Sequence, residues 1–253
     1  MSSRLPWDGR RFYRRGGALT LTGLAPDDRG GENHDTRADH VHRTPFKNLV
    51  PPPPTLRLAD QRAALLVVDF QVFAADRSTG LGRLAAERGL EDELEEYYEQ
   101  VGHARRNVRD LLTAFRARSF PVLYSRRVAR PGTAPPWIPT ADDGTAPVVP
   151  DLAPVAGDVV VTRAATSPFA GGALDAALTA AHVRSLVVTG LVLGGTVDYA
   201  VREAAEQDRS VVLVADACAA ETYALHDCVS TQLGGGVVRV RPTDAVLAML
   251  ARA

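Results

Sequence analysis

The run Ala63-Ala-Leu-Leu-Val-Val68, followed at once by Asp69, decides the fold of this chain. Six consecutive apolar residues lack the alternation of apolar and polar positions that marks a strand with one face in water, so both faces should be buried. A strand of that kind is typical of the centre of a parallel sheet that helices cover on both sides. We therefore predict an α/β domain built around residues 63–68.

Strand and helix patterns alternate along the rest of the chain. Apolar residues recur at helical spacing over 93–118, 171–181, 197–207, 222–233 and 243–252. Short apolar runs predict further strands at 121–124, 159–161, 185–189, 211–215 and 237–240. This alternation predicts a three-layer Rossmann-like fold, with a mostly parallel six-stranded sheet and helices on both faces.

Residues 1–55 follow neither pattern and are predicted to form a tail. They mix Gly, Asp, Arg and His and end in the run Pro51-Pro-Pro-Pro54, which favours a stiff polyproline spacer. A chain of 253 residues suits one well-filled core. We therefore expect a single domain over residues 56–253.

Composition narrows the choice of partners. The chain has 29 Lys and Arg against 30 Asp and Glu, so no strong field attracts nucleic acid or anionic lipid. Its apolar runs are far shorter than the roughly 20 residues that span a bilayer, and no apolar leader is evident, so we expect a cytoplasmic protein with a small-molecule substrate. Cys218 and Cys228 are expected to be packed, reduced thiols. His34, His40 and His42 lack a recognised ligand spacing and should be solvated.

Polar residues at the ends of three predicted strands point to one site. In open parallel sheets, ligands bind beyond the carboxyl ends of the strands, near the point where the strand order reverses. Asp69 ends the first strand, Arg163 lies at the end of the third, and residues 190–196 follow the fourth. We therefore expect Asp69, Arg163 and Thr196 to share one cavity.

Asp69 has two interpretations. Because it follows an apolar strand and precedes Phe70, burial should raise its proton affinity, which suits a general acid or base. An aspartate at a strand end can also cap a neighbouring helix. Spacing alone leaves both open.

Gly194-Gly195-Thr196 predicts a turn that leads into a helix. The N–H groups at a helix start can bind a developing oxyanion, so Val192 and Leu193 join the two glycines as candidate oxyanion or substrate-binding residues. Thr196 has a second interpretation as the N-cap of that helix. The segment lacks both the G-x-G-x-x-G spacing and a Walker lysine, so no dinucleotide cofactor is expected.

Other candidate substrate-binding residues lie near the same edge or on the Pro- and Gly-rich connection over 131–150. Connections of this length often cover a site. Each of these residues could instead belong to the core or the surface. They are Gln71, Phe73, Tyr124, Arg127, Trp137, Phe169 and Tyr199.

Several segments together resemble one protein family. Ala63-Ala-Leu-Leu-Val-Val-Asp-Phe-Gln71 resembles the opening strand of isochorismatase-like, or cysteine hydrolase, proteins. The family's lysine segment is similar to residues 157–163 with Ser167-Pro-Phe169 and Leu174-Asp175. Its nucleophile segment is similar to residues 186–190 with Val197 and Arg202-Glu-Ala204. A later block is similar to residues 214–220 with His226. The resemblance covers roughly residues 60–250.

The family's triad of aspartate, lysine and cysteine hydrolyses amide, ureido and related C–N bonds. By resemblance, Asp69 matches the aspartate, while Arg163 stands at the lysine position and Thr196 at the cysteine position. A threonine hydroxyl stays protonated unless a strong base is adjacent, and arginine cannot shuttle a proton. The resemblance therefore implies a hydrolase that works without the cysteine.

Relatives that hydrolyse a vinyl ether also lack the cysteine and are thought to use the aspartate as an acid. By that resemblance, Asp69 protonates the alkene, water adds to the oxocarbenium carbon, and Arg163 binds a substrate carboxylate. The resemblance further implies a cis peptide bond near 191–193 and a homo-oligomer, either dimer or tetramer. Zinc-containing relatives carry an Asp-x-His pair, which Phe73-Ala-Ala-Asp76 lacks, so we expect no metal and no other cofactor.

Three functions remain open from the sequence. The first is a small-molecule hydrolase that uses Asp69 for proton transfer. The second is a lyase or isomerase of specialised metabolism, which labelled water would distinguish from the first. The third is a binding or assembly protein, which would stay inactive towards amides after Thr196→Cys with Arg163→Lys while the parent binds ligand.

Overall fold

One six-stranded parallel sheet forms the centre of the described chain. The computed structural model describes residues 56, 58, 62–130, 132, 135–234 and 238–251, so the predicted tail and its histidines lie outside the described residues. The strands are β1 (Ala63–Val68), β2 (Val122–Arg127), β3 (Val159–Arg163), β4 (Ser185–Leu191), β5 (Ser210–Ala219) and β6 (Val238–Arg241). Their order is β3-β2-β1-β4-β5-β6, and all five pairings are parallel. The predicted sheet is confirmed.

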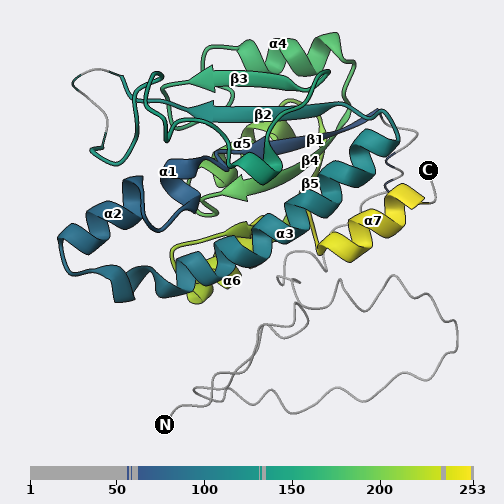
Figure 1. Cartoon of the computed structure of the whole chain (residues 1–253). Coiled ribbons are helices and arrows are strands. Elements are labelled where there is room, and N and C mark those ends of the chain that lie inside the picture. Colours follow the sequence, from purple (N-terminus) through teal and green to yellow (C-terminus); the bar gives the residue numbers. More distant parts are fainter. Residues whose placement is uncertain are drawn as a thin grey trace, which may run out of the picture. The chain divides into compact units, whose positions relative to one another are not determined.

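Helices cover both faces of this sheet (Figure 1). On one face pack α3 (Glu95–Ala117) and α7 (Thr243–Ala251). On the other pack α4 (Ala173–Ala180), α5 (Thr196–Glu206) and α6 (Tyr223–Leu233). The three-layer arrangement matches the prediction.

Two short helices were not predicted. They are α1 (Val72–Ala75) and α2 (Gly80–Glu87), and a 3₁₀ segment at Glu91–Leu94 joins them to α3. A four-residue helix is too short to show a helical period, and α1 depends on backbone contacts with a distant segment: the N–H groups of Val72 and Phe73 donate to the carbonyls of Pro147 and Thr145. These tertiary contacts leave no local trace in the sequence.

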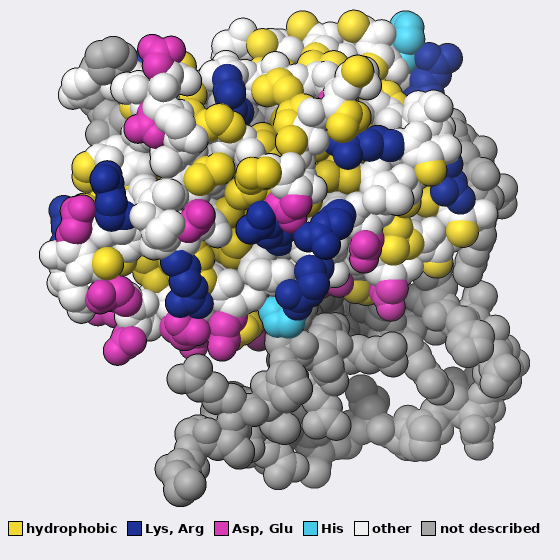
Figure 2. Space-filling view, viewed as in Figure 1, with side chains coloured by type: hydrophobic (Ala, Val, Ile, Leu, Met, Phe, Trp, Pro, Cys, Tyr) yellow, Lys and Arg dark blue, Asp and Glu magenta, His cyan; other side chains and the backbone are white. Residues whose placement is uncertain are grey.

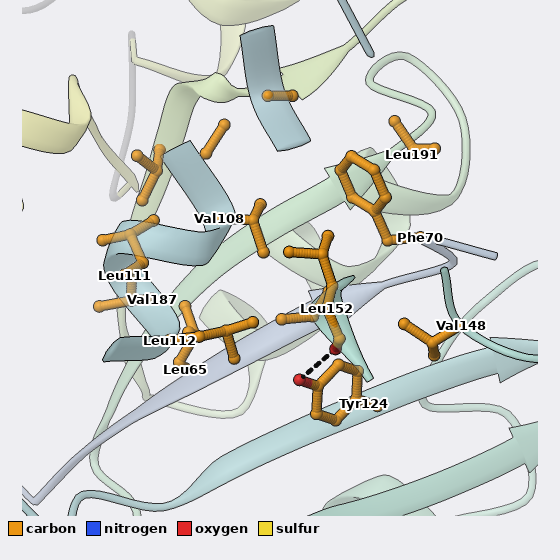
Figure 3. Packing of buried hydrophobic residues seen from close by; sticks show 14 of the residues in the cluster. Leu65, Phe70, Val108, Leu111, Leu112, Tyr124, Val148, Leu152, Val187 and Leu191 are labelled. Carbon is orange, nitrogen blue, oxygen red and sulfur yellow. Dashed lines mark hydrogen bonds between the residues drawn. The ribbon is translucent and has the colours of Figure 1, made fainter. Parts of the chain in front are cut away.

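The two faces of β1 contribute to two separate hydrophobic clusters. Leu65 and Val67 pack with α3, whereas Leu66 and Val68 pack with α4 and α5, and all of them are at most 1% exposed. Figure 3 shows Leu65 among Val108, Leu111, Leu112 and Val187 from α3 and β4. Burying a leucine or valine side chain stabilises a fold by about 1.5–3 kcal/mol, so the uninterrupted apolar run is accounted for.

Tyr124, a candidate substrate-binding residue, belongs instead to the core. Its ring is completely buried, and its hydroxyl donates to the Leu152 carbonyl at 2.8 Å (Figure 3). The Arg116 guanidinium donates to the same hydroxyl and forms an ion pair with Asp158 at 2.6 Å. The tyrosine therefore fixes the segment that precedes β3.

Charged side chains of both signs are interspersed over the face that carries α3 (Figure 2). Several of them are paired: Asp151 binds both Arg105 and Arg109 of this helix. Within the described ranges, no helix combines the length and apolar character needed to cross a membrane.

The strand order reverses beside β1. The chain adds β2 and β3 on one side of β1 and then returns to place β4 on its other side. Asp69 follows β1 and the 192–196 turn follows β4, so both lie at the reversal, where open parallel sheets bind ligands.

β4 approaches β1 closely at Gly190. Its φ is +134°, and a Cβ built there would lie 2.0 Å from the Val68 carbonyl oxygen. The register between β4 and β5 shifts between Val188 and Gly190. Only glycine fits this contact without displacing backbone atoms.

We therefore expect Gly190→Ala to lower the free energy of unfolding by at least about 2 kcal/mol. Gly102 is a matched control, because it lies within α3 and a Cβ there meets nothing within 4 Å. Gly102→Ala should raise stability by up to about 1 kcal/mol through its better helix propensity. Urea denaturation of both variants measures the effect, and similar stability changes in the two would contradict the tight contact.

Candidate active site

Asp69 occupies a tight turn directly after β1. Its φ is +48°, its N–H donates to the Ser125 carbonyl at 2.9 Å, and its own carbonyl accepts from the Gln71 N–H at 2.7 Å. Aspartate is one of the few residue types that tolerate a positive φ, and such positions cluster at functional sites. The turn fixes the backbone from which the carboxylate projects.

The Asp69 carboxylate is bound by the side chain of Arg163. The two terminal guanidinium nitrogens each donate to a different carboxylate oxygen at 2.8 Å. Both side chains are buried, with 6% of Asp69 and 3% of Arg163 exposed. This bidentate geometry is the strongest that an arginine and a carboxylate can form. The carboxylate thus binds Arg163, so the interpretation of Asp69 as a helix cap is wrong.

Thr196 completes the group. The structure starts α5 at Thr196 and places Gly195 at the N-cap, so the prediction of Thr196 as N-cap is wrong by one residue. A residue inside the first turn is not positioned to cap it, and the buried Thr196 hydroxyl instead hydrogen-bonds to the Asp69 carboxylate. The structure therefore brings together the acid, the guanidinium and the hydroxyl from three distant segments.

Burial controls the electrostatics of this cluster. It raises the pKa of the Asp69 carboxyl above its ordinary 3.8, while hydrogen bonds from Arg163 and Thr196 and the charges of Arg163 and Arg127 oppose the rise. Burial also lowers the pKa of Arg127. A carboxyl with a raised pKa exchanges its proton closer to neutral pH than an exposed one does, as catalytic acids and bases require.

In the turn after β4, most of the backbone hydrogen bonds are made to other residues of the protein. The expected cis peptide bond lies between Leu191 and Val192. Leu193 is buried in the core and its N–H donates to the Ala219 carbonyl at 2.8 Å, while the Val192 carbonyl accepts from Gly195 at 3.0 Å and from Val197 at 3.2 Å. Gly194 has a φ of +88° beside side chains of α6. The Leu193 and Gly195 amides are thus bonded internally, and Thr196 offers the first amide of α5.

Gln71 is entirely buried and connects separate backbone segments. Its side-chain amide donates to the carbonyls of Arg127 at 2.9 Å and Ala146 at 2.5 Å, and accepts from the Arg127 N–H at 2.6 Å. An isolated bridge also pairs Gln71 with Val148. The predicted connection over 131–150 therefore returns to the carboxyl ends of β1 and β2, held there by a residue predicted to bind substrate.

The predicted aromatic residues lie in different surroundings. Phe73 and Phe169 are buried, and they belong to the two different hydrophobic clusters. Trp137 is 36% exposed and Tyr199 is 51% exposed. No contact joins these four side chains to Asp69 among the described interactions, whereas half-buried Arg127 does interact with its charge.

Two residues of the cluster were missed by the sequence analysis. The Thr166 carbonyl accepts from Arg163 at 3.1 Å, and its hydroxyl accepts from Arg127 at 3.2 Å. Ser125 is 1% exposed, and its carbonyl binds the Asp69 N–H. A serine in the apolar part of β2 was the available signal for Ser125. Thr166 lies in a loop whose path the sequence does not define.

The two cysteines lie outside this cluster. Cys218 is buried within β5, where burial raises the pKa of its thiol and the Gly190 N–H donates to it. Cys228 is exposed on α6, so the expectation that it is packed is wrong. In the part of the chain that the structure describes, no group of three or more His, Cys, Asp or Glu residues is placed to bind a metal.

Solved structures share this fold. A cysteine hydrolase from Pseudomonas syringae pv. phaseolicola is 22% identical and superposes with a TM-score of 0.68, over 80% of this chain and 98% of its own. An isochorismatase family protein from Burkholderia thailandensis is 25% identical, with a TM-score of 0.64 over 79% of this chain and 100% of its own. Another, from Desulfovibrio vulgaris, is 22% identical, with a TM-score of 0.61 over 76% and 100%.

Sequence comparison gives the more specific result. No curated protein matches this chain. The family model for the isochorismatase domain, however, matches residues 63–242, which include all six strands and the whole Asp69 cluster. The chain therefore belongs to the isochorismatase family.

Proposed function

We propose that this chain hydrolyses a small molecule, at an amide or ureido C–N bond or at a vinyl ether, without a cysteine nucleophile. The observation that carries the proposal is the buried Asp69 carboxylate at the strand-order reversal, bound by Arg163 and by the Thr196 hydroxyl. Family membership supports hydrolysis, and the buried carboxyl with a raised pKa supports proton transfer.

For a C–N bond, ionised Asp69 acts first as a general base. It accepts a proton from water as the water oxygen attacks the carbonyl carbon, and the amide of Thr196 stabilises the resulting oxyanion. Asp69 then donates this proton to the nitrogen as the C–N bond breaks. The products are an acid and an amine, and Asp69 is again a carboxylate.

For a vinyl ether, protonated Asp69 acts first as a general acid. It donates its proton to the terminal alkene carbon, which leaves an oxocarbenium ion. Water adds to the positive carbon and returns a proton to Asp69, and the hemiketal separates into a ketone and an alcohol. Arg163 stabilises the carboxylate that exists between the two proton transfers.

Arg163 is best assigned as a positioning residue. The family resemblance implied that it binds a substrate carboxylate, but both of its terminal nitrogens bind Asp69. Arginine stays protonated throughout the reaction. Proton transfer therefore falls to Asp69, while Arg163 fixes the orientation of its carboxylate.

Asp69→Asn should lower kcat by at least about 100-fold, because the amide cannot exchange the proton. The assay uses simple amides, N-carbamoyl amino acids and enol-ether carboxylates as substrates. Asp76→Asn is the matched control: Asp76 is exposed, binds Ser78, and should leave kcat unchanged. Full activity of Asp69→Asn would remove Asp69 from the mechanism, and a product without oxygen from ¹⁸O-labelled water would exclude hydrolysis.

The pH dependence of kcat distinguishes the two routes. The vinyl-ether route needs protonated Asp69, so kcat should fall as pH rises through the raised pKa of this residue. The C–N route needs the carboxylate, so kcat should rise through the same pKa. A pH profile of kcat for each active substrate measures this direction. A flat profile over the titration of Asp69 would contradict both routes.

Arg163→Met should reduce stability by about 3 kcal/mol, because it leaves a buried carboxylate without its partner. Since the substitution removes a charge and hydrogen bonds that lower the pKa of Asp69, burial raises this pKa further above 3.8. A carboxyl whose pKa is higher in the folded than in the unfolded state stabilises the folded state only while it is protonated. The variant should therefore be most stable at acidic pH and lose stability as pH rises through the pKa of folded Asp69.

Urea denaturation at mildly acidic and at alkaline pH measures this effect. The double variant Asp69→Asn with Arg163→Met is the control, because it has no buried charge at this position and should show less pH dependence. An equal loss of stability at both pH values in Arg163→Met would show that Arg163 does not compensate the Asp69 charge.

A further inference from the structure

We propose that Arg127 binds a carboxylate group of the substrate, so that the molecules this site accepts are small carboxylic acids. This inference rests on the proposed function and adds the substrate class. It is carried by the buried, incompletely bonded donors that surround Asp69 and by the charge balance of the cluster.

The terminal nitrogens of Arg163 are not available for a substrate anion. Its two terminal nitrogens bind the two oxygens of Asp69, and one of them also donates to the Thr166 carbonyl. An arginine recognises a carboxylate through two parallel N–H groups, and this pair is already occupied. A second cation is therefore needed to bind a substrate carboxylate.

Arg127 is that cation. It is paired with Arg163 in the parallel register of β2 and β3, so both side chains leave the same face of the sheet at its carboxyl end. One terminal nitrogen donates to the Thr166 hydroxyl at 3.2 Å, and Nε is buried without a hydrogen-bond partner in the described chain. Arg127 therefore keeps donors for a ligand.

Two more buried donors without a partner in the described chain lie on the same face. The Ser125 hydroxyl belongs to a 1% exposed residue two positions before Arg127, and Arg163 Nε belongs to a 3% exposed side chain. Ser125 is also paired with Val68, the residue before Asp69. Buried donors without acceptors cost free energy, which a ligand with several acceptor oxygens would recover.

The charge of the cluster favours a carboxylate over a phosphate. The charges that act on Arg127 are those of Asp69 and Arg163, so with Asp69 ionised the three groups together carry one net positive charge. A carboxylate carries one negative charge and neutralises it, whereas a phosphate monoester carries about −1.5 to −2 near neutral pH. The bidentate geometry of arginine suits both anions, so the charge decides.

Calorimetric titration of acetate, succinate and benzoate, each compared with its neutral amide, tests the inference. The wild type should bind a carboxylate more tightly than its amide and more tightly than inorganic phosphate. Arg127→Met should weaken carboxylate binding by about tenfold or more and leave amide binding unchanged, because a hydrogen-bonded charge is lost. Arg127→Lys should recover only part of the affinity, since it restores the charge without the parallel N–H groups of the guanidinium.

Arg126→Met is the matched control. Arg126 is the adjacent strand residue, so its side chain leaves the opposite face, where it donates to the Thr162 hydroxyl. It has the same charge and should not affect carboxylate binding. No carboxylate binding by the wild type, equal losses in Arg126→Met and Arg127→Met, or tighter binding of phosphate would each overturn the inference. Thermal unfolding confirms that each variant is folded.

The binding measurement needs no turnover, so the two proposals can fail separately. A protein that binds carboxylates through Arg127 but hydrolyses none of the substrates contradicts the proposed function alone. A protein that hydrolyses them, yet binds carboxylates equally well after Arg127→Met, contradicts this inference alone.

Discussion

The candidate site depends on the compensation of one buried negative charge. A carboxylate removed from water is costly unless hydrogen bonds and an opposite charge replace its hydration, and Arg163 supplies both to Asp69. The partner is an arginine, whose guanidinium binds both carboxylate oxygens at once and cannot give up a proton. In the proposed mechanism, an arginine at the position where the family resemblance implies a lysine leaves proton transfer to Asp69.

Two arginines at paired positions of neighbouring strands have different surroundings. Arg163 is almost fully buried and bound to Asp69, whereas Arg127 is half-buried and donates to the Thr166 hydroxyl. The parallel pairing of β2 with β3 thus places two arginine side chains beside Asp69. The two arginines differ in burial, and we assign them different roles for this reason. The arrangement resembles a positioned acid next to a cation that can still accept a ligand. It follows from the strand register and not from any short motif.

The sequence predicted the sheet well because the apolar runs of its strands are continuous. It placed β1 at its observed bounds, but it ended β2, β3, β4 and β5 too early. β2 and β3 end in polar residues, among them Arg127 and Arg163, so their apolar pattern stops before the strand does. Asp69, Arg163 and Thr196 could be placed from the strand ends and the family resemblance. The contacts of Gln71 with Ala146 and of Thr166 with Arg127 could not, because they join segments that are far apart in the chain.

The close approach at Gly190 has a consequence for the chemistry as well as for folding. Gly190 lies opposite Val68, one residue before Asp69, and the backbone that leaves it leads within six residues to Thr196. A Cβ at Gly190 would displace the Val68 backbone, and with it the turn that carries the Asp69 carboxylate. A single methyl group at this position would therefore move the acid relative to the Thr196 hydroxyl that bonds to it.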